Sequence, residues 1–174
     1  GSDSILRSMN RKHNVKEYIN VIEKVRNYNP NIAISGDFII GFPGETDKDN
    51  QATIDLIKEI KYSQAYSFKY STRPGTPAAI SLNQVDESVK NSRLQEVQSV
   101  LRDQQLEFNK NSINLSLKIL VLRNGKKPNQ YLGRSQYNQS VYFGSEEKNL
   151  IGSTININVT KAFQNSLTGN IINI

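Results

Sequence analysis

Residues 36–46 read GDFIIGFPGET, and this stretch decides the fold of the first half of the chain. The longer segment 32–42 is too apolar for a surface strand, and a strand covered on both faces usually belongs to a parallel sheet. Glycine and proline then close the strand, and a helix begins near Thr46. The stretch therefore predicts a buried strand that turns directly into a helix.

Helical patterns lie on both sides of this strand. The helix before it begins after Asn14, which is placed with Glu17 as a capping box, and it ends before Pro30. After the helix that begins near Thr46, the segment 65–71 alternates like a strand, and an apolar helical period runs from about residue 86 to 111. Helix, strand, helix, strand and helix in this order predict βα units with right-handed crossovers, so the sheet is parallel. Two strands leave both sheet edges open, and we interpret this half as a truncated α/β barrel or sheet.

The pattern changes at residue 112 to short strands with turn residues between them. The expected strands are 117–122, 130–135, 140–143, 153–159 and 166–174. Five short strands in about 60 residues suit a small closed or partly open β-barrel of the OB type. The expected fold class is therefore α/β plus all-β, with domains at 1–111 and 112–174.

The positive charge gathers in the second of these domains. Residues 1–111 hold 15 Lys and Arg against 14 Asp and Glu, whereas residues 112–174 hold 7 against 2, which accounts for five of the six net charges. A mostly polar segment with such a surplus attracts polyanions, and nucleic acid is the usual one. The alternative is that the charge only keeps the protein in solution.

Cysteine is absent from the sequence, and histidine occurs once. The chain therefore has no disulfide, no thiolate nucleophile and no cysteine ligands for zinc or an iron–sulfur cluster. No apolar run approaches the roughly 20 residues of a membrane span, and the first residues lack a signal peptide, so we expect a cytoplasmic protein with no membrane partner. Because the sequence starts at Gly1 rather than methionine, we expect a piece of a longer protein.

Two charged residues and one turn are candidates for ligand binding. Asp37 lies in an apolar strand, where an unpaired buried carboxylate costs several kcal/mol, so it should meet a cation or accept hydrogen bonds from ligand hydroxyls. Arg73 follows the next strand, at the same rim of the sheet, and could reach a carboxylate or phosphate or form only a surface ion pair. The glycine-rich turn after the strand could bind an anion or could be only a tight connection.

Three motifs carry a resemblance to a known family: GSDSILRSMNRKH at 1–13, GDFIIGFPGET at 36–46 and YSTRPGTPAA at 70–79. In this order, and followed by a small basic β-domain, they resemble the radical-SAM tRNA methylthiotransferases over essentially the whole chain. The resemblance implies the C-terminal part of a radical-SAM partial (β/α)6 barrel followed by a TRAM domain, a small OB-like RNA-binding β-barrel.

The same resemblance implies the reaction and its cofactors. Such enzymes methylthiolate isopentenyl-adenosine next to the tRNA anticodon, with S-adenosylmethionine and two [4Fe-4S] clusters. The cysteines that hold those clusters are missing here, so the fragment alone is expected to be inactive, monomeric and bound to the anticodon stem-loop of tRNA. The resemblance assigns no catalytic or metal-binding residue to this chain.

Several positions match cofactor and substrate residues of the family. Arg11 falls where relatives hold the methionyl carboxylate of S-adenosylmethionine, Asp37 where they hold its ribose, and Arg73 where tRNA-modifying members have a substrate arginine. The expected cofactor-binding residues are Ser2, Arg11, Asp37, Ile39, Gly41 and Phe42.

An RNA-binding face is expected in the second domain from its charge, its strand pattern and its interleaved aromatic residues. Tyr137 and Tyr142 are additional candidates for stacking on bases. The expected RNA-binding residues are Lys118, Arg123, Lys126, Lys127, Arg134 and Tyr131. Gly133 and Arg134 match a Gly-Arg strand of the family, whereas Leu122 stands where members often have glutamate.

A second hypothesis remains open at this point. The chain could be a stand-alone RNA-binding module whose truncated α/β half is only a scaffold, and the absence of cysteine favours that interpretation. An upstream reading frame that continues into cysteine-containing sequence would separate the two.

Overall fold

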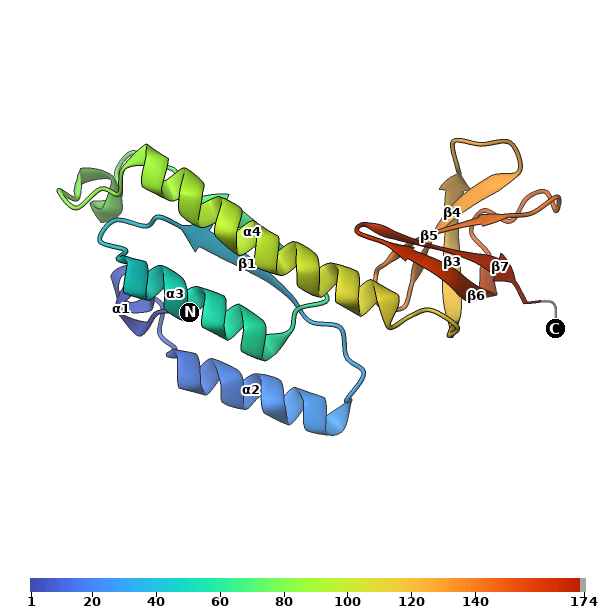
Figure 1. The fold of residues 1–174 in the computed structure, drawn as a ribbon, viewed down its shortest axis with the longest axis horizontal. Helices are drawn as coiled ribbons and strands as arrows, with labels where there is room; N and C mark the ends of the chain where they lie inside the picture. Colours follow the sequence, from blue (N-terminus) through green and yellow to red (C-terminus); the bar gives the residue numbers. More distant parts are fainter. Residues whose placement is uncertain (173–174) are drawn as a thin grey trace. The chain divides into compact units, whose positions relative to one another are not determined.

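A computed structural model describes residues 1–172 of the chain (Figure 1). Its Cα positions divide into two compact units, residues 1–104 and the residues from 105 onward, each described by itself below. In the described part of the chain no helix is both long enough and apolar enough to cross a membrane.

The first unit contains helices around a two-stranded sheet. Its elements are α1 (Asp3–Ser8), α2 (Val15–Tyr28), β1 (Ser35–Ile40), α3 (Asp47–Ile60), β2 (Gln64–Lys69), a short 3-10 helix (Pro77–Ile80) and most of α4 (Glu87–Lys110). The strands β1 and β2 are parallel, as the alternation of strands and helices predicts, with Ser35 opposite Gln64 and Ile40 opposite Lys69. Neither α1 nor the 3-10 helix was expected from the sequence.

Side-chain caps set the starts of the two amphipathic helices. At α2 the Glu17 N–H donates to Asn14 Oδ1 at 2.8 Å, and the Asn14 N–H donates to Glu17 Oε2 at 3.0 Å, so the expected capping box is confirmed. At α3 Thr46 and Asp49 form the same reciprocal pair. These bonds satisfy backbone N–H groups that a helix start leaves without partners.

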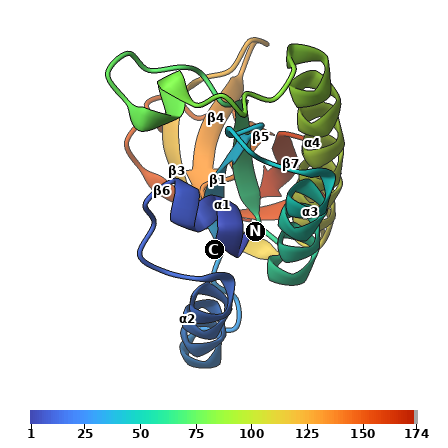
Figure 2. The same cartoon turned by 90° about the vertical axis from the view of Figure 1, so that its left-hand side faces the viewer.

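Only one face of the sheet is covered. Phe38 and Ile40 on β1 are buried in a cluster with residues of α3 and α4, which lie along the same side of the strand (Figure 2). On the opposite face Ile39 is 42% exposed and Phe68 of β2 is 54% exposed. The expectation of a strand covered on both faces is therefore wrong, because Ile39 and Phe68 stay largely exposed on this side among the described residues. We call it the open face of the sheet.

The second unit is a closed five-stranded barrel with the strand order β3-β4-β5-β7-β6. The strands are β3 (Ser116–Asn124), β4 (Gln130–Ser135), β5 (Ser140–Gly144), β6 (Thr154–Phe163) and β7 (Ser166–Ile171). All neighbours pair antiparallel except β5 and β7, which are parallel. The five expected strands are found, although the end of the last expected strand, residues 173–174, lies outside the described residues.

The last turn of α4 packs into this barrel unit. The rings of Phe108 and Tyr137 meet edge to face at 5.9 Å, and Asn109 Nδ2 donates to the Phe163 carbonyl at 2.8 Å. Gln139 Nε2 in turn donates to Asn109 Oδ1 at 2.9 Å. Because these helix residues contact the barrel strands and loops, the end of α4 belongs to the second unit, and the boundary at residues 104–105 lies within α4.

Candidate functional site

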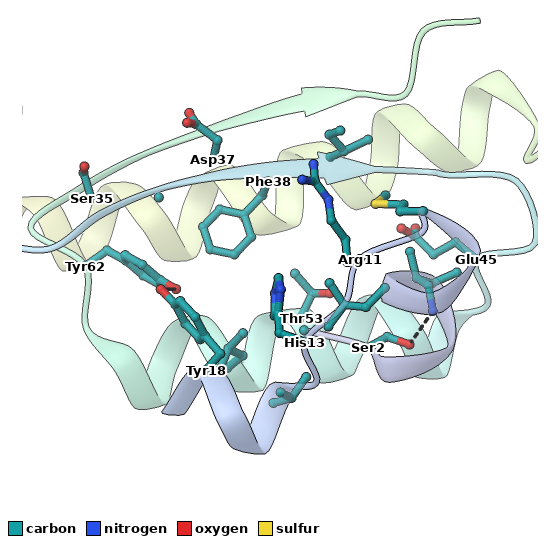
Figure 3. Close-up of a pocket in the computed structure, with 18 residues that line it drawn as sticks. Ser2, Arg11, His13, Tyr18, Ser35, Asp37, Phe38, Glu45, Thr53 and Tyr62 are labelled. Carbon is teal, nitrogen blue, oxygen red and sulfur yellow. Dashed lines mark hydrogen bonds between the residues drawn. The ribbon is translucent and has the colours of Figure 1, made fainter. Parts of the chain in front are cut away.

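Two neighbouring cavities lie in the first unit. The β1 cavity, of about 410 Å³, is lined by α1, the start of α2 and the length of β1 (Figure 3). The β2 cavity, of about 570 Å³, is lined by the end of α1, the end of β2 and the loop at residues 71–78. Met9, Arg11 and Ile39 line both, so the two hollows share a wall.

At one end of the β1 cavity Ser2 organises the start of α1. Its buried hydroxyl accepts from the Ile5 N–H at 3.4 Å and donates to Asp49 Oδ1 at 2.5 Å. Burial works against ionisation of Asp49, but hydrogen bonds from Ser2, Ser4 and Thr46 outweigh it and hold the pKa of that carboxyl well below its usual range. The Ser2 hydroxyl already donates its hydrogen to Asp49. A ligand in this cavity could therefore only donate a hydrogen bond to the Ser2 oxygen.

The glycine-rich turn after β1 is held by an internal carboxylate. Glu45 is buried, its Oε2 accepts from the Gly41 N–H at 3.0 Å, and its Oε1 lies 3.1 Å from Arg93 Nη1 of α4. Burial raises the pKa of Glu45, although the Gly41 N–H and Arg93 act in the opposite direction. Because Gly41 already donates to Glu45, its N–H is not free for an outside anion, which favours the tight-connection reading of this turn.

Gly41 itself is required by the backbone. Its φ is +74°, and an added Cβ would lie 2.4 Å from Lys90 Cγ. Gly41 lines neither cavity.

Arg11 and Asp37 both line the β1 cavity. Figure 3 shows Arg11 extending towards β1, while Asp37 and Phe38 project from opposite sides of the strand. Asp37 is exposed, so the prediction of a buried carboxylate is wrong: odd-numbered residues of β1 point to the open face. Among the described residues no ion pair joins Arg11 to Asp37. Because both side chains are exposed to solvent, neither requires an ionic partner within the protein.

Aromatic rings that the sequence reasoning did not single out form the other end of the β1 cavity. The hydroxyls of Tyr18 and Tyr62 are 2.8 Å apart, and Phe38 meets Tyr62 edge to face at 5.3 Å. Burial and the hydrogen bond with Tyr18 both raise the pKa of Tyr62. His13 lies on the same wall and is exposed. The sequence signal for this wall was weak because Tyr18 and Tyr62 are separated by 44 residues.

The β2 cavity contains the expected substrate residue. Arg73 is exposed in a turn in which the Thr76 hydroxyl donates to the Arg73 carbonyl at 2.8 Å and Gly75 has φ +80°. Phe42, expected beside the cofactor, lines this cavity and not the β1 cavity. Of the six expected cofactor residues, the β1 cavity thus brings together Ser2, Arg11, Asp37 and Ile39.

In the second unit the expected basic residues share the hairpin of β3 and β4. Lys118, Arg123 and Arg134 are exposed on the strands, and Lys126 and Lys127 are exposed in the turn between them. Leu120 pairs with Arg134 across the two strands and is itself 45% exposed. The hairpin therefore presents a mixed basic and apolar surface.

Tyr131 is not available to RNA, and this expectation is wrong. It is 8% exposed, stacks on Phe143 at 5.7 Å inside the barrel and donates its hydroxyl to the Glu147 carbonyl at 2.9 Å. Tyr137 packs against the last turn of α4, whereas Tyr142 follows the inward-facing Val141 and is only half-buried. Strand alternation, rather than proximity to basic residues, decides which tyrosine faces outward.

The residues of this chain do not fit an iron–sulfur cluster. The sequence has no cysteine, and the described residues contain no group of three or more His, Asp or Glu side chains that could hold a metal ion. The β1 cavity is instead lined by a guanidinium, from Arg11, and a carboxylate, from Asp37. These groups are suited to an organic ligand that has a carboxylate and hydroxyls.

Similarity to known proteins supports the same family. Residues 1–57 match the model of the Radical SAM superfamily. The chain is 48% identical over 172 residues to tRNA-2-methylthio-N(6)-dimethylallyladenosine synthase of Rickettsia rickettsii (strain Sheila Smith), and 47% identical over 175 residues to the protein of the same name in Ehrlichia chaffeensis. The chain is a homologue of these synthases. The resemblance inferred from the three motifs is thereby confirmed.

The similarity to the synthases runs through both units. The alignments cover 99% of this chain, and the chain spans 39% and 40% of the length of these two relatives. A comparison with the synthase of Rickettsia felis gives the same coverage at 48% identity.

Proposed function

We propose that this chain is part of a tRNA methylthiotransferase that acts on dimethylallyladenosine (isopentenyl-adenosine) next to the anticodon. The observation that carries the proposal is the 48% identity to synthases of that name across 99% of the chain, cavities and barrel included. The stand-alone RNA-binding alternative is not favoured, because it leaves the similarity of the first unit without a role. We further infer that the first unit is the end of a partial (β/α)6 barrel, that the second is a TRAM-like domain, and that the enzyme works in the cytoplasm.

The β1 cavity suits S-adenosylmethionine, which when bound would supply the radical and the methyl group of this chemistry. Arg11 would bind the methionyl carboxylate, since a guanidinium matches a carboxylate in a bidentate manner. Asp37 would accept from the ribose hydroxyls, and Ile39 would lie against the adenine ring. The exposure of Arg11 and Asp37 supports this role, because neither is engaged by another described charged side chain.

The two iron–sulfur clusters would need thiolates from polypeptide other than these 174 residues. We therefore expect the chain alone to bind ligands without methylthiolating them. We also expect it to be a monomer. The basic hairpin of β3 and β4 would hold the phosphates of the anticodon stem-loop, and the half-buried Tyr142 is the remaining outward tyrosine for stacking.

Calorimetric titration of S-adenosylmethionine into the chain tests the cofactor site. Arg11→Ala should weaken binding by about 1.5–3 kcal/mol, the usual contribution of a hydrogen bond to a charged group, and Asp37→Ala should weaken it by about 1–3 kcal/mol. Arg7→Ala is the matched control, because Arg7 is an exposed arginine of α1 that lines neither cavity. Wild-type affinity in the Arg11 and Asp37 variants, or no binding by the wild-type chain, would contradict the assignment.

A further inference from the structure

Arg11 lies just beyond the end of α1, and backbone hydrogen bonds tie it to that helix. The Arg11 N–H donates to the Leu6 carbonyl at 2.8 Å, and the Asn10 N–H donates to the Arg7 carbonyl at 2.9 Å. Asn10 has φ +56°, in the left-handed region. The two hydrogen bonds and the left-handed residue form a Schellman motif, which ends a helix in a defined geometry. The position of the Arg11 backbone therefore follows the position of α1.

The helix α1 is too short to hold its own position. It has six residues, and none of them is buried. An isolated helix shorter than about 12 residues is marginal in water, because forming its first turn fixes several backbone dihedral angles for a single hydrogen bond. We therefore expect the position of α1 to depend on specific contacts with neighbouring elements.

Asp49 of α3 makes such a contact with the start of α1. Its Oδ1 accepts from the Ser2 hydroxyl at 2.5 Å and from the Ser4 hydroxyl at 2.6 Å. Its Oδ2 accepts from the Thr46 N–H at 2.9 Å and from the Thr46 hydroxyl at 2.6 Å, within the capping box of α3. Hydrogen bonds to an ionised carboxylate are stronger than those between neutral groups. One carboxylate thus joins the first turns of two helices.

A second carboxylate holds the segment that contains Arg11 from its other end. Asp3, the first residue of α1, accepts with its Oδ1 from the N–H of Val15, the first residue of α2, at 2.8 Å. The chain between the two helices, residues 9–14, is therefore closed into a loop whose ends are fixed to each other. A shift of α1 would move this loop with it.

We propose that Asp49 is a positioning residue for the β1 cavity: through Ser2 and Ser4 it holds α1, and α1 in turn holds Arg11. The inference rests on the proposed function, in which Arg11 binds the methionyl carboxylate of S-adenosylmethionine. Ser2, at the start of α1, and Arg11, beyond its end, both line the β1 cavity (Figure 3). Asp49 lines neither cavity, so it acts on a ligand only through its neighbours. A bidentate pair of guanidinium and carboxylate is directional, and a displaced Arg11 would bind more weakly.

Two hydroxyl deletions test the proposal, because Ser4 and Thr46 each donate a 2.6 Å hydrogen bond to the same carboxylate. Ser4→Ala loosens α1 and should weaken binding of S-adenosylmethionine to the 174-residue chain by about three- to tenfold in a calorimetric titration. Asp49→Asn should weaken it at least as much, and Ser4→Thr, which keeps the hydroxyl, should bind like the wild-type chain. Thr46→Ala is the matched control: it loosens only the start of α3 and should change the affinity by less than about twofold.

A ligand without the carboxylate separates positioning of Arg11 from a general loss of structure. 5′-Methylthioadenosine has the nucleoside and the sulfur of S-adenosylmethionine but no carboxylate, and Ser4→Ala should change its affinity by less than about twofold. Ser4→Ala added to Arg11→Ala should likewise change S-adenosylmethionine affinity by less than about twofold further, since both substitutions act through one guanidinium. Equal losses for the two ligands in Ser4→Ala, or equal effects of Ser4→Ala and Thr46→Ala, would overturn the proposal.

Hydrogen exchange of the ligand-free chain, followed by NMR, measures the contact with α1 separately. Exchange of the Arg11 amide, which is bonded to the Leu6 carbonyl, should be at least about threefold faster in Ser4→Ala than in Thr46→Ala. Unchanged exchange at Arg11 would overturn the proposal. Unchanged S-adenosylmethionine affinity in Ser4→Ala, while Arg11→Ala weakens it, would overturn this inference alone. Faster exchange at Arg11 in a chain whose wild type fails to bind S-adenosylmethionine would support the role of Asp49 in holding Arg11 and count against the cofactor site.

Discussion

Glu45 fixes the turn between β1 and α3 from the inside. It accepts from the Gly41 N–H at 3.0 Å, and Arg93 donates to both its carboxylate and its carbonyl oxygen, at 3.1 and 3.0 Å. Arg93 also donates to Asp47 Oδ1 at 2.7 Å, which ties the first turn of α3 to α4. The turn beside the β1 cavity therefore contains a buried carboxylate both of whose oxygens have partners within the protein.

Asp49 gives a prediction about pH. Its pKa is lowered in the folded chain, so its contribution to stability is present above its ordinary pKa of about 4 and is lost as pH falls below that value. Asp49→Asn should lower the free energy of unfolding at pH 7 by about 1 kcal/mol, the usual loss for a helix cap, and should make stability less dependent on pH below 4.

Urea denaturation between pH 3 and pH 7 measures this effect. Asp103→Asn, a change at an exposed carboxylate of α4, is the control and should leave both stability and its pH dependence nearly unchanged. A pH profile of Asp49→Asn parallel to that of the wild-type chain would show that the three hydroxyl contacts contribute nothing to folding.

The sequence predicted which residues line the cavities better than it predicted how buried each of them is. Arg11, Asp37 and Arg73 do line cavities. Arg73 does so because it follows the end of β2, whereas Arg11 follows α1 and Asp37 lies within β1. The burial of Asp37 was predicted wrongly, since the apolar run around it does not show which face the helices cover. Glu45 and Arg93 were missed because a contact between residues 48 apart leaves no pattern in local spacing.

At the scale of elements, the β3–β4 hairpin combines charge with apolar surface. Gly133 allows its two strands to approach closely, since an added Cβ would lie 2.4 Å from Ile119 Cγ2 and 2.6 Å from the Leu120 carbonyl oxygen. Arg134 follows directly and points outward, with its Nη1 donating to the Asn138 carbonyl at 2.7 Å. The guanidinium is therefore held in place on the face where RNA binding is proposed.

Salt dependence tests that face. Replacing Arg123, Lys126 and Lys127 together by alanine should reduce the slope of log affinity against log salt by about 2–3, because each phosphate contact releases a counterion. The control is the triple variant Lys24→Ala, Lys48→Ala and Lys58→Ala, which removes the same charge from exposed positions of the first unit.

Fluorescence anisotropy with an anticodon stem-loop at several salt concentrations gives both slopes. The hairpin variant should lose slope and the control variant should not. Equal slopes in the two variants would leave the positive charge of the second unit as a feature of solubility.

Elements with clear start signals could be predicted, and short ones could not. The helices α2 and α3 have caps followed by a 3.6-residue period, and the barrel strands alternate between turns. The six residues of α1 are too few for a period to show. The end of α4 was assigned to the first domain because its helical period continues unbroken, while its contacts with the barrel arise only in three dimensions.

At the scale of the whole molecule, one chain carries two kinds of candidate binding surface. The first unit offers two cavities that share Arg11, and the second offers a basic barrel hairpin. The proposed function would use both, because the cavities would bind the cofactor and the modified nucleoside and the hairpin would bind phosphates of the same tRNA. A tRNA that engages both units gains affinity without any further contact, since the second binding event is intramolecular.

The most direct measurement of this account compares two anticodon stem-loops, one with dimethylallyladenosine beside the anticodon and one with unmodified adenosine. Both are titrated into the 174-residue chain at low salt and followed by fluorescence anisotropy. The account predicts that both bind, that binding weakens with salt, and that the modified stem-loop binds at least about tenfold more tightly. Equal affinity for the two stem-loops, or no binding of either, would contradict it.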